Sequence, residues 1–264
     1  MPVSAEPRTA SPRIALSDVH GHLDALRGML LELELTAPGD VWAGGDRQLW
    51  LLGDYLDRGP DGLEVVDMVR RLQSEARGVG GRIHPLLGNH ELQFLAALHF
   101  GHRTVPHQPD TTWMSGWLRF GGVEEELRAV SDEQVEWMTE LPLIDAVDGV
   151  VLAHSDSEGY LELGQTVEEI NAVGRDILAG RDQTRWALLH ELMTRKGDFL
   201  TSAAVDRFVG TLGAQRVIHG HSTLGGVFHL GPEDRTRPHV YADGRVTAID
   251  GGVFEGGVLI PVAW

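Results

Sequence analysis

Short apolar segments that end abruptly in polar residues recur along this chain and constrain its fold more than any other feature. Five of them are predicted to be buried strands, at residues 14–16, 49–52, 82–87, 147–153 and 216–218. Stretches with apolar residues at helical spacing lie between and after them, at residues 23–35, 63–72, 92–100, 131–141, 167–178, 183–193 and 203–212. Alternating strands and helices predict an α/β architecture of packed layers. The last part of the chain predicts antiparallel strands, at residues 227–230, 239–241, 245–250 and 257–261.

Potential metal ligands follow these strands directly. They are Asp18, His20, Asp54, Asn89, His154 and His221. Ligands of α/β sheets bind at the carboxyl ends of strands, so we expect these side chains to converge. They offer oxygen and imidazole donors, and the chain has no cysteine, which favours divalent first-row metals such as Mn, Fe, Zn or Co. The set exceeds what one tetrahedral ion needs, so it predicts two ions that share a carboxylate. Asp54 is the candidate bridge because it follows the central strand of the set.

The same loops carry groups suited to phosphate chemistry. Arg58 follows the Asp54 loop, and a guanidinium there can bind phosphate oxygens in bidentate fashion. His90 follows Asn89 and is expected to face the metals. Asp57 is expected to accept a hydrogen bond from that ring and favour its protonated form, which makes His90 the candidate general acid for a leaving alkoxide. Glu91 is expected to brace the loop.

Charge and composition narrow the range of partners. Lys plus Arg number 22 and Asp plus Glu number 39, a formal net charge of −17. Without a Lys/Arg cluster, this balance disfavours nucleic acid as a partner. No apolar run approaches the roughly 20 residues that span a bilayer, so no membrane association is expected. The absence of cysteine fits a cytoplasmic protein.

One domain is expected over residues 14–264, preceded by a flexible tail at residues 1–13 that contains three prolines. Residues 99–120 show no periodic pattern and are expected to form an irregular lid or rim. Trp113 and Trp117 in this stretch either anchor it to the core or stack on a substrate.

Five short motifs occur in order along the chain and together closely resemble the calcineurin-like metallophosphoesterases, in their phosphoprotein-phosphatase branch. They are Asp18-Val19-His20-Gly21, Gly53-Asp54-Tyr55-Leu56-Asp57-Arg58-Gly59, Gly88-Asn89-His90-Glu91, His154 and Gly220-His221. Their spacing is similar to that of the Shewanella-like and Rhizobiales-like phosphatases and of the symmetrical diadenosine tetraphosphate hydrolases. The resemblance implies a two-sheet β-sandwich flanked by helices, with a dimetal site at the carboxyl ends of the strands.

The resemblance also implies a role for each matching position. Asp18, His20 and Asp54 match the ligands of a first metal, and Asp54, Asn89, His154 and His221 those of a second. Two divalent ions are implied, Mn foremost, with Fe, Zn, Co or Ni as alternatives. His90 and Asp57 match the proton-donating pair, and Arg58 matches a phosphate-binding arginine. Asn89 and Arg195 complete the predicted substrate contacts.

The function that follows is a phosphatase that hydrolyses phosphomonoesters by direct attack of a hydroxide held by both metals. Many diesterases of the superfamily carry a second histidine two places after the Gly-His pair, where this chain has Thr223. The favoured substrate is a phosphoprotein, with Ser/Thr or Tyr as the modified residue. A dinucleoside polyphosphate or nucleotide hydrolase and a phosphatase of small phosphorylated molecules are the alternatives. A non-catalytic binding protein fits least, because it has no need for His90, Asp57 and Arg58.

Overall fold

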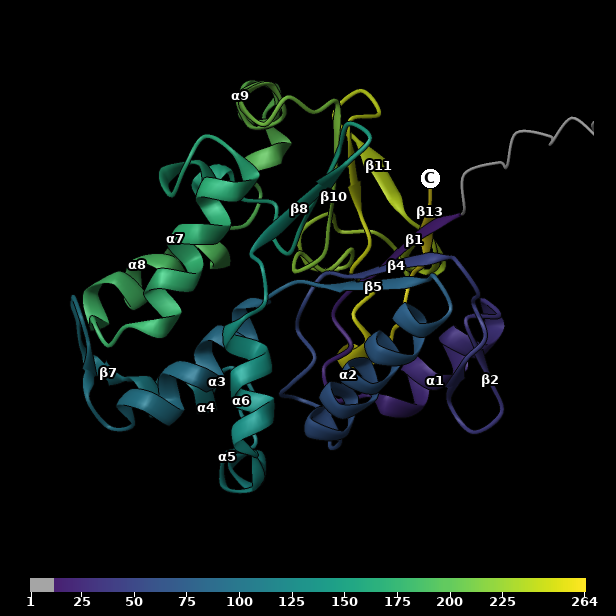
Figure 1. Ribbon diagram of the computed structural model, residues 1–264. Helices are drawn as coiled ribbons and strands as arrows, with labels where there is room; N and C mark the ends of the chain where they lie inside the picture. The colour runs from purple at the N-terminus through teal and green to yellow at the C-terminus, as the bar shows by residue number, and fades with distance from the viewer. Residues whose placement is uncertain (1–11) are drawn as a thin grey trace, which may run out of the picture.

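Two β-sheets stacked face to face form the centre of the molecule, and helices cover their outer faces (Figure 1). The computed structural model describes residues 12–264. The predicted tail at residues 1–13 lies outside this range except for Pro12 and Arg13, and Arg13 already begins the first strand. The sandwich flanked by helices confirms the predicted fold.

Three parallel strands and one antiparallel edge strand make up the first sheet. In spatial order they are β13 (Val262–Ala263), β1 (Arg13–Leu16), β4 (Gln48–Leu51) and β5 (Arg82–Pro85). Strand β4 pairs with β1 on one side and β5 on the other, with Trp50 opposite Ala15 and His84. The central position expected for the strand before Asp54 is therefore confirmed.

The second sheet has three parallel strands between two antiparallel edges. In spatial order they are β11 (His239–Tyr241), β12 (Val246–Ala248), β10 (Arg216–His219), β9 (Val150–Ala153) and β8 (Ile144–Val147). Two small hairpins stand apart from both sheets, β2 (Thr36–Ala37) with β3 (Val41–Trp42), and β6 (Thr104–Val105) with β7 (Gln108–Thr112).

Alternation along the central strands decides which side chains fill which layer. Trp50 and Leu52 point between the sheets, where they meet Val150, Leu152 and Ile218. The neighbours of Trp50, Leu49 and Leu51, belong to the core beneath the helices. Successive side chains of a strand point to opposite faces, so one continuous apolar run supplies both layers.

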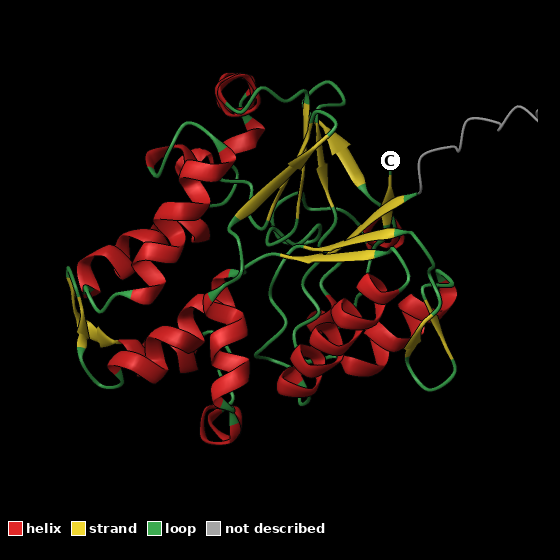
Figure 2. Cartoon of the chain, viewed as in Figure 1, coloured by secondary structure: helices red, strands yellow, loops and turns green. Residues whose placement is uncertain are grey.

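Nine α-helices are found in residues 12–264 and appear in red in Figure 2. Their bounds are α1 (Leu23–Glu32), α2 (Gly62–Gly78), α3 (Asn89–Phe100), α4 (Trp113–Arg119), α5 (Glu124–Ala129), α6 (Asp132–Thr139), α7 (Val167–Ala179), α8 (Gln183–Thr194) and α9 (Ser202–Thr211). Helices α1 and α2 lie below the first sheet in Figure 1, whereas α7, α8 and α9 flank the second. Within the described part of the chain, no helix is both long and apolar enough to cross a membrane.

The structure differs from the sequence prediction in residues 99–120, which are ordered rather than irregular. They form the β6–β7 hairpin and then helix α4. The hairpin is mostly exposed, so it lacks the alternation of apolar residues that marks a half-buried strand. Helix α4 did carry a signal, because Thr112 and Ser115 form a capping box and Trp113 and Trp117 are four residues apart.

Two other segments differ as well. The run at residues 147–153 spans the turn of the β8–β9 hairpin, with a tight connection at Asp148 and Gly149. Near the end of the chain, neither residues 227–230 nor residues 257–261 form a strand. The last strand, β13, begins at Val262. Strands β11 and β12 pair antiparallel, as expected, and β12 also pairs in parallel with β10. Strand direction depends on the partner across the sheet, which local sequence does not specify.

A carboxyl group lies buried at the amino-terminal end of α2. Glu126, on α5, is 5% exposed, and its Oε1 accepts a hydrogen bond of 2.7 Å from the backbone N–H of Gly62. Its Oε2 has no hydrogen-bond partner in the described structure. Burial raises the pKa of Glu126 to about 7, with a further contribution from the charge of Asp57. The folded state therefore favours the protonated acid.

We predict that Glu126→Gln makes the metal-free protein less sensitive to alkaline pH. A carboxyl whose pKa is raised on folding stabilises the fold fully below its unfolded value, and this contribution is lost as pH rises through about 7. At pH 8 the variant should gain about 1–3 kcal/mol in unfolding free energy over wild type, with little difference at pH 4.5. Urea denaturation in EDTA across this range measures both. Glu125→Gln, at an exposed neighbour, is the control, and an equal response of the two variants would contradict the assignment.

Candidate metal centre

The carboxyl ends of strands from both sheets meet at one rim of the sandwich. Asp18 and His20 follow β1, and Asp54 follows β4. Asn89 and His90 open helix α3 after β5, and His154 and His221 follow β9 and β10 of the second sheet. Gly220 permits the two sheets to approach, because a Cβ there would lie 1.9 Å from Ser17 Oγ. The convergence predicted for the strand-end residues is thus observed.

The loops at this rim hold an unusual number of residues in the left-handed region. Six non-glycine residues there have φ between 46° and 69°, namely Asp18, His20, Asp54, Asp57, Arg58 and His221. Such residues cost of order 1 kcal/mol or more each and persist only where the surrounding structure holds them. Strained backbone of this kind gathers at functional sites, so it marks the same loops that the side-chain chemistry does.

Two groups of potential metal ligands lie at the rim and share Asp54. One contains His20, Asp54 and His90, and the other Asp54, His154 and His221, with the ligand atoms of each group within 4.8 Å of one another. Asp54 Oδ2 is 3.5 Å from His20 Nε2, and Asp54 Oδ1 is 3.4 Å from His154 Nε2. Each carboxylate oxygen therefore faces a different group, as a bridging ligand requires.

Two other predicted ligands border these groups. Asn89 Oδ1 lies 2.8 Å from His154 Nε2, on the second group. Asp18 Oδ1 lies 3.9 Å from His20 Nε2, whereas its Oδ2 accepts hydrogen bonds from Ser17 Oγ and from the backbone N–H of His221. All six predicted ligands are thus brought together at one rim.

Backbone carbonyls orient the histidine rings. His20 Nδ1 is 3.1 Å from the carbonyl of Leu56, and His154 Nδ1 is 2.9 Å from that of Leu52. These contacts assign the proton to Nδ1 and leave Nε2 as a free electron-pair donor. Burial lowers the pKa of both rings below the usual value, so they are neutral, which is the form that binds metals.

The carboxylates at the rim repel one another. Burial raises the pKa of Asp54 well above its usual value, and the charges of Asp18 and Glu91 raise it further. Asp250, also buried, has its pKa raised by burial and by Asp18. Divalent cations among these groups would offset both the desolvation and the repulsion. Neutral imidazoles beside oxygen donors therefore fit divalent metal ions.

Glu91 braces the site as expected, through its buried carboxylate. Oε2 accepts hydrogen bonds from the backbone N–H groups of Gly88 and Asp54, and Oε1 accepts from those of Tyr55 and Leu56, at distances of 2.8–3.2 Å. This one side chain ties the loop after β4 to the start of α3. His90 adds a bond of 3.0 Å from its backbone N–H to Asp54 Oδ1.

The predicted proton-donating pair is in contact. His90 Nδ1 and Asp57 Oδ2 are 2.7 Å apart, and both side chains are buried. Burial raises the pKa of Asp57 to about 7 although Trp117 and Arg58 oppose the shift, and burial together with the charge of Arg58 lowers the pKa of His90. Such a short contact between the two groups requires one shared proton.

Arg58 lies beside the pair, with its NH2 atom 3.1 Å from His90 Nε2. Its guanidinium stacks on Phe254, whose ring centroid is 3.8 Å away. No described contact joins Arg195 to the metal-binding residues. Its nitrogens pair with Glu162 and Glu191 instead. The adjacent Lys196 donates to the carbonyl of His221 at 3.0 Å, so it supplies the cation in that part of the rim.

Sequence reasoning missed Lys196, Phe254 and the contact between Trp117 Nε1 and Asp57 Oδ1, which is 2.8 Å long. The last contact joins residues 60 positions apart, and no local pattern signals it. The sequence did offer a signal for Lys196, because it is a second cation directly after the predicted Arg195. Neighbouring residues at a helix end point in different directions, so only one of the two is expected to face the rim.

The chain matches the sequence model of the calcineurin-like phosphoesterase family over residues 12–223. It is 35% identical over 79 residues to Shewanella-like protein phosphatase 2 of Arabidopsis thaliana, covering 30% of this chain and 20% of that protein. It is 31% identical over 142 residues to the symmetrical bis(5'-nucleosyl)-tetraphosphatase of Cronobacter sakazakii, covering 53% of this chain and 41% of that enzyme. The chain therefore spans less than half the length of these curated relatives.

The fold is also shared with a solved structure. The cold-active protein-tyrosine phosphatase of a psychrophilic Shewanella superposes with a TM-score of 0.72 at 20% identity, over 96% of this chain and 75% of that one. The similarity covers both sheets of the sandwich, whose rim carries the predicted ligands. Because the family match extends over most of the sequence, the chain belongs to the calcineurin-like phosphoesterases.

Proposed function

We propose that this chain is a metal-dependent phosphomonoesterase that acts on phosphoproteins. The observation that carries the proposal is the buried His90–Asp57 pair beside Arg58, adjoining two potential metal groups that share Asp54. Proton donation, phosphate binding and metal binding then occur within one rim. A protein that only bound phosphate would not need a buried acid next to its binding site.

In this proposal two divalent ions are held by the six predicted ligands. Asp18, His20 and Asp54 would hold the first ion, and Asp54, Asn89, His154 and His221 would hold the second. Mn is favoured because carboxylate and amide oxygens suit this hard ion, and the neutral imidazoles also admit Fe, Zn, Co or Ni. When bound, the ions neutralise phosphate charge and lower the pKa of water.

Arg58 binds the phosphoryl oxygens. Its guanidinium is oriented by the ring of Phe254 and by a bond of 3.4 Å from Nε to the carbonyl of Phe120. This leaves its terminal nitrogens facing the rim. Lys196 provides a second positive charge near His221. We assign the second phosphate contact to Lys196 rather than to Arg195, which is paired with two carboxylates.

In the structure the guanidinium of Arg58 donates to His90 Nε2. When Arg58 turns to a bound phosphate, the protonated ring of His90 can give a proton from Nε2 to the leaving oxygen. Asp57 accepts a hydrogen bond from the other ring nitrogen, Nδ1, and thereby stabilises the positive charge of the protonated ring. Trp117 keeps Asp57 oriented through the bond to its second oxygen. Leaving groups with a high pKa depend most on this proton, because an alkoxide is otherwise a poor leaving group.

Different relatives support different substrate classes. The match to a protein named a Shewanella-like protein phosphatase supports a phosphoprotein substrate. The match to an enzyme named a bis(5'-nucleosyl)-tetraphosphatase supports a dinucleoside polyphosphate instead, which we keep as the second candidate. Phosphate release from a phosphopeptide and from diadenosine tetraphosphate, each with Mn²⁺ after metal removal, distinguishes them. Turnover of the dinucleotide alone would overturn the phosphoprotein assignment.

We predict that His90→Asn slows hydrolysis of alkyl phosphates about 10²–10⁴-fold, because the general acid is lost. The loss should be much smaller with p-nitrophenyl phosphate, whose leaving group needs little protonation. Metal content, measured by mass spectrometry of the purified variant, should remain at the wild-type level. His102→Asn, at an exposed histidine, is the matched control. A loss of bound metal in His90→Asn would instead identify His90 as a ligand.

We predict that Asp54→Asn weakens binding at both metal positions, because each of its carboxylate oxygens faces one group. Titration with Mn²⁺ followed by calorimetry should show at least a tenfold loss of affinity for each of the two ions. By contrast, His221→Ala should affect one ion only. Asp67→Asn, at an exposed helix position, controls for the general change in charge. A variant at position 54 that still bound two ions tightly would rule out the bridge.

A further inference from the structure

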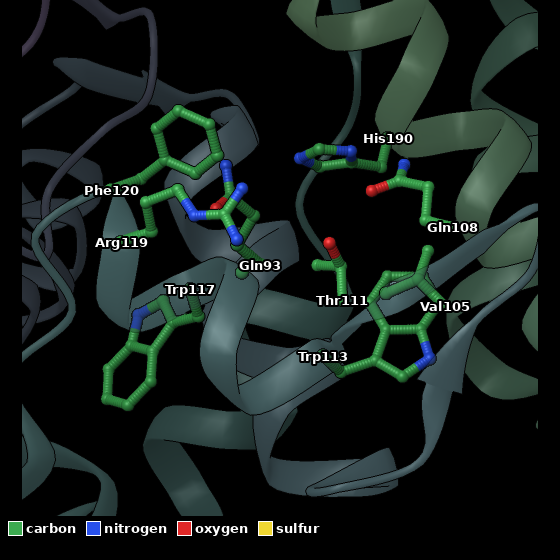
Figure 3. A pocket seen from close by; sticks show the side chains of 10 residues that line it. Gln93, Val105, Gln108, Thr111, Trp113, Trp117, Arg119, Phe120 and His190 are labelled. Atoms are coloured by element: carbon green, nitrogen blue, oxygen red, sulfur yellow. The ribbon is translucent and has the colours of Figure 1, made fainter.

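A cavity of about 180 Å³ adjoins the His90–Asp57 pair, between α3, α4, the β6–β7 hairpin and α8 (Figure 3). Its apolar lining comes from Val105, Trp113, Trp117 and Phe120. Gln93 and Arg119 lie on one side of it, and Gln108 and His190 on the other. None of the predicted metal ligands lines it. The cavity is therefore separate from the metal groups and has its own chemistry.

Residues of the cavity wall contact the proton-donating pair and Arg58 directly. Trp117 donates to Asp57, and the carbonyl of Phe120 accepts from Arg58. Gln93 follows His90 by one turn of α3, so their side chains lie on neighbouring parts of one helix face. A group esterified to a phosphate bound by Arg58 would have its oxygen at His90 and would extend toward this cavity.

One buried polar atom at the cavity has no hydrogen-bond partner within residues 12–264. It is Nε2 of His190. Gln93, whose side chain is 6% exposed, also lines the cavity. Burial lowers the pKa of His190 to about 4, so its ring is neutral. Leaving a buried polar group unsatisfied costs about 1–3 kcal/mol, which a ligand's polar groups would recover.

The cavity continues into a longer groove. A second hollow of about 630 Å³ runs between α8 and the hairpin, and it shares Val105, Gln108 and His190 with the first. Its lining is mostly apolar and includes Leu188, which is 42% exposed. Arg119, at the first cavity, pairs with no carboxylate in the described structure. The combined surface thus has a small apolar end beside the proton donor His90, a longer open part, and the cation of Arg119, which has no carboxylate partner.

We propose that the small cavity receives the aromatic ring of a phosphotyrosine, and that the peptide main chain follows the groove along α8. This rests on the proposed phosphomonoesterase function and specifies its substrate. Sites that bury a drug-sized ligand measure about 300–1,000 Å³, so a cavity of about 180 Å³ suits a single ring. A phosphoserine side chain would leave it unfilled. A main-chain group of the peptide would satisfy His190, and an acidic residue beside the phosphotyrosine would pair with Arg119.

Gly116 allows the cavity to be filled without touching a catalytic group. It lines the cavity within α4, and a Cβ there would meet only Thr111 Cγ2, at 3.4 Å. The larger side chain of Gly116→Leu would extend into the cavity. Gly78→Leu, at the end of α2 where a Cβ meets nothing within 4 Å, is the matched control.

The test compares kcat/KM of the Mn²⁺-loaded enzyme on two peptides that differ only in phosphotyrosine or phosphoserine. Wild type should favour phosphotyrosine at least tenfold, and Gly116→Leu should lower that activity by about tenfold or more while phosphoserine changes less than about twofold. Equal activity of wild type on both peptides, or an equal loss on both in Gly116→Leu, would overturn the ring assignment and leave the phosphoprotein phosphatase intact. No activity on either peptide, with diadenosine tetraphosphate hydrolysed, would overturn the proposed function itself.

A second variant keeps the proposal testable should Gly116→Leu fail to fold. Arg119 is exposed, so Arg119→Glu leaves the core unchanged. It should lower kcat/KM about five- to tenfold on a phosphotyrosine peptide with acidic flanks, and much less on one with neutral flanks. Equal effects on the two peptides would argue against a peptide in this groove. Adenosine monophosphate turnover that depended on Gly116 would indicate a nucleotide as the occupant instead.

Discussion

The buried carboxylate of Glu91 is the interaction on which the rest of the site depends. It accepts four backbone hydrogen bonds, three from the loop that carries Asp54 and one from Gly88, before α3. Asp54 belongs to both potential metal groups, and α3 begins with Asn89 and His90. One side chain therefore sets the spacing between a bridging ligand, a second ligand and the proton donor. Its burial raises its own pKa to about 7, so the bonds from the backbone offset a real desolvation cost.

The rim stores unfavourable energy that binding can release. Carboxylates repel one another there, and six residues hold left-handed backbone angles. The glycines of this region allow the loops to approach closely, as at Gly59, where a Cβ would lie 2.2 Å from the carbonyl of His20. The surrounding sandwich supplies the stability that keeps these loops in place. Cations at the rim would relieve the repulsion, so metal binding and the preorganised shape of the site support each other.

In our proposal, catalysis and substrate selectivity depend on different parts of the molecule. The strand-end loops of the two sheets carry the metal ligands, whereas α3, α4, α8 and the β6–β7 hairpin enclose the cavity beside His90. Trp117 belongs to both, because its ring lines the cavity and its Nε1 orients Asp57. A leaving group that packs against this ring lies beside the group that protonates it. Changes in the helices could therefore alter substrate preference while the metal site stays constant.

The sequence predicted the convergence of the six ligands, because each ligand follows an apolar strand directly and parallel strands end at a common edge. The two-sheet sandwich was implied only by the resemblance of the five motifs to a known family. The sequence also indicated the bracing role of Glu91, which lies in the same short motif as Asn89 and His90. It did not reveal the β6–β7 hairpin, whose exposed residues lack periodicity, or the pairing of Arg195 with Glu162 and Glu191. The contact of Trp117 with Asp57, the partner of β12 and the cavity beside His90 arose only on folding. Each of these depends on residues far apart in the chain, and local propensity carries no information about which distant surfaces will meet.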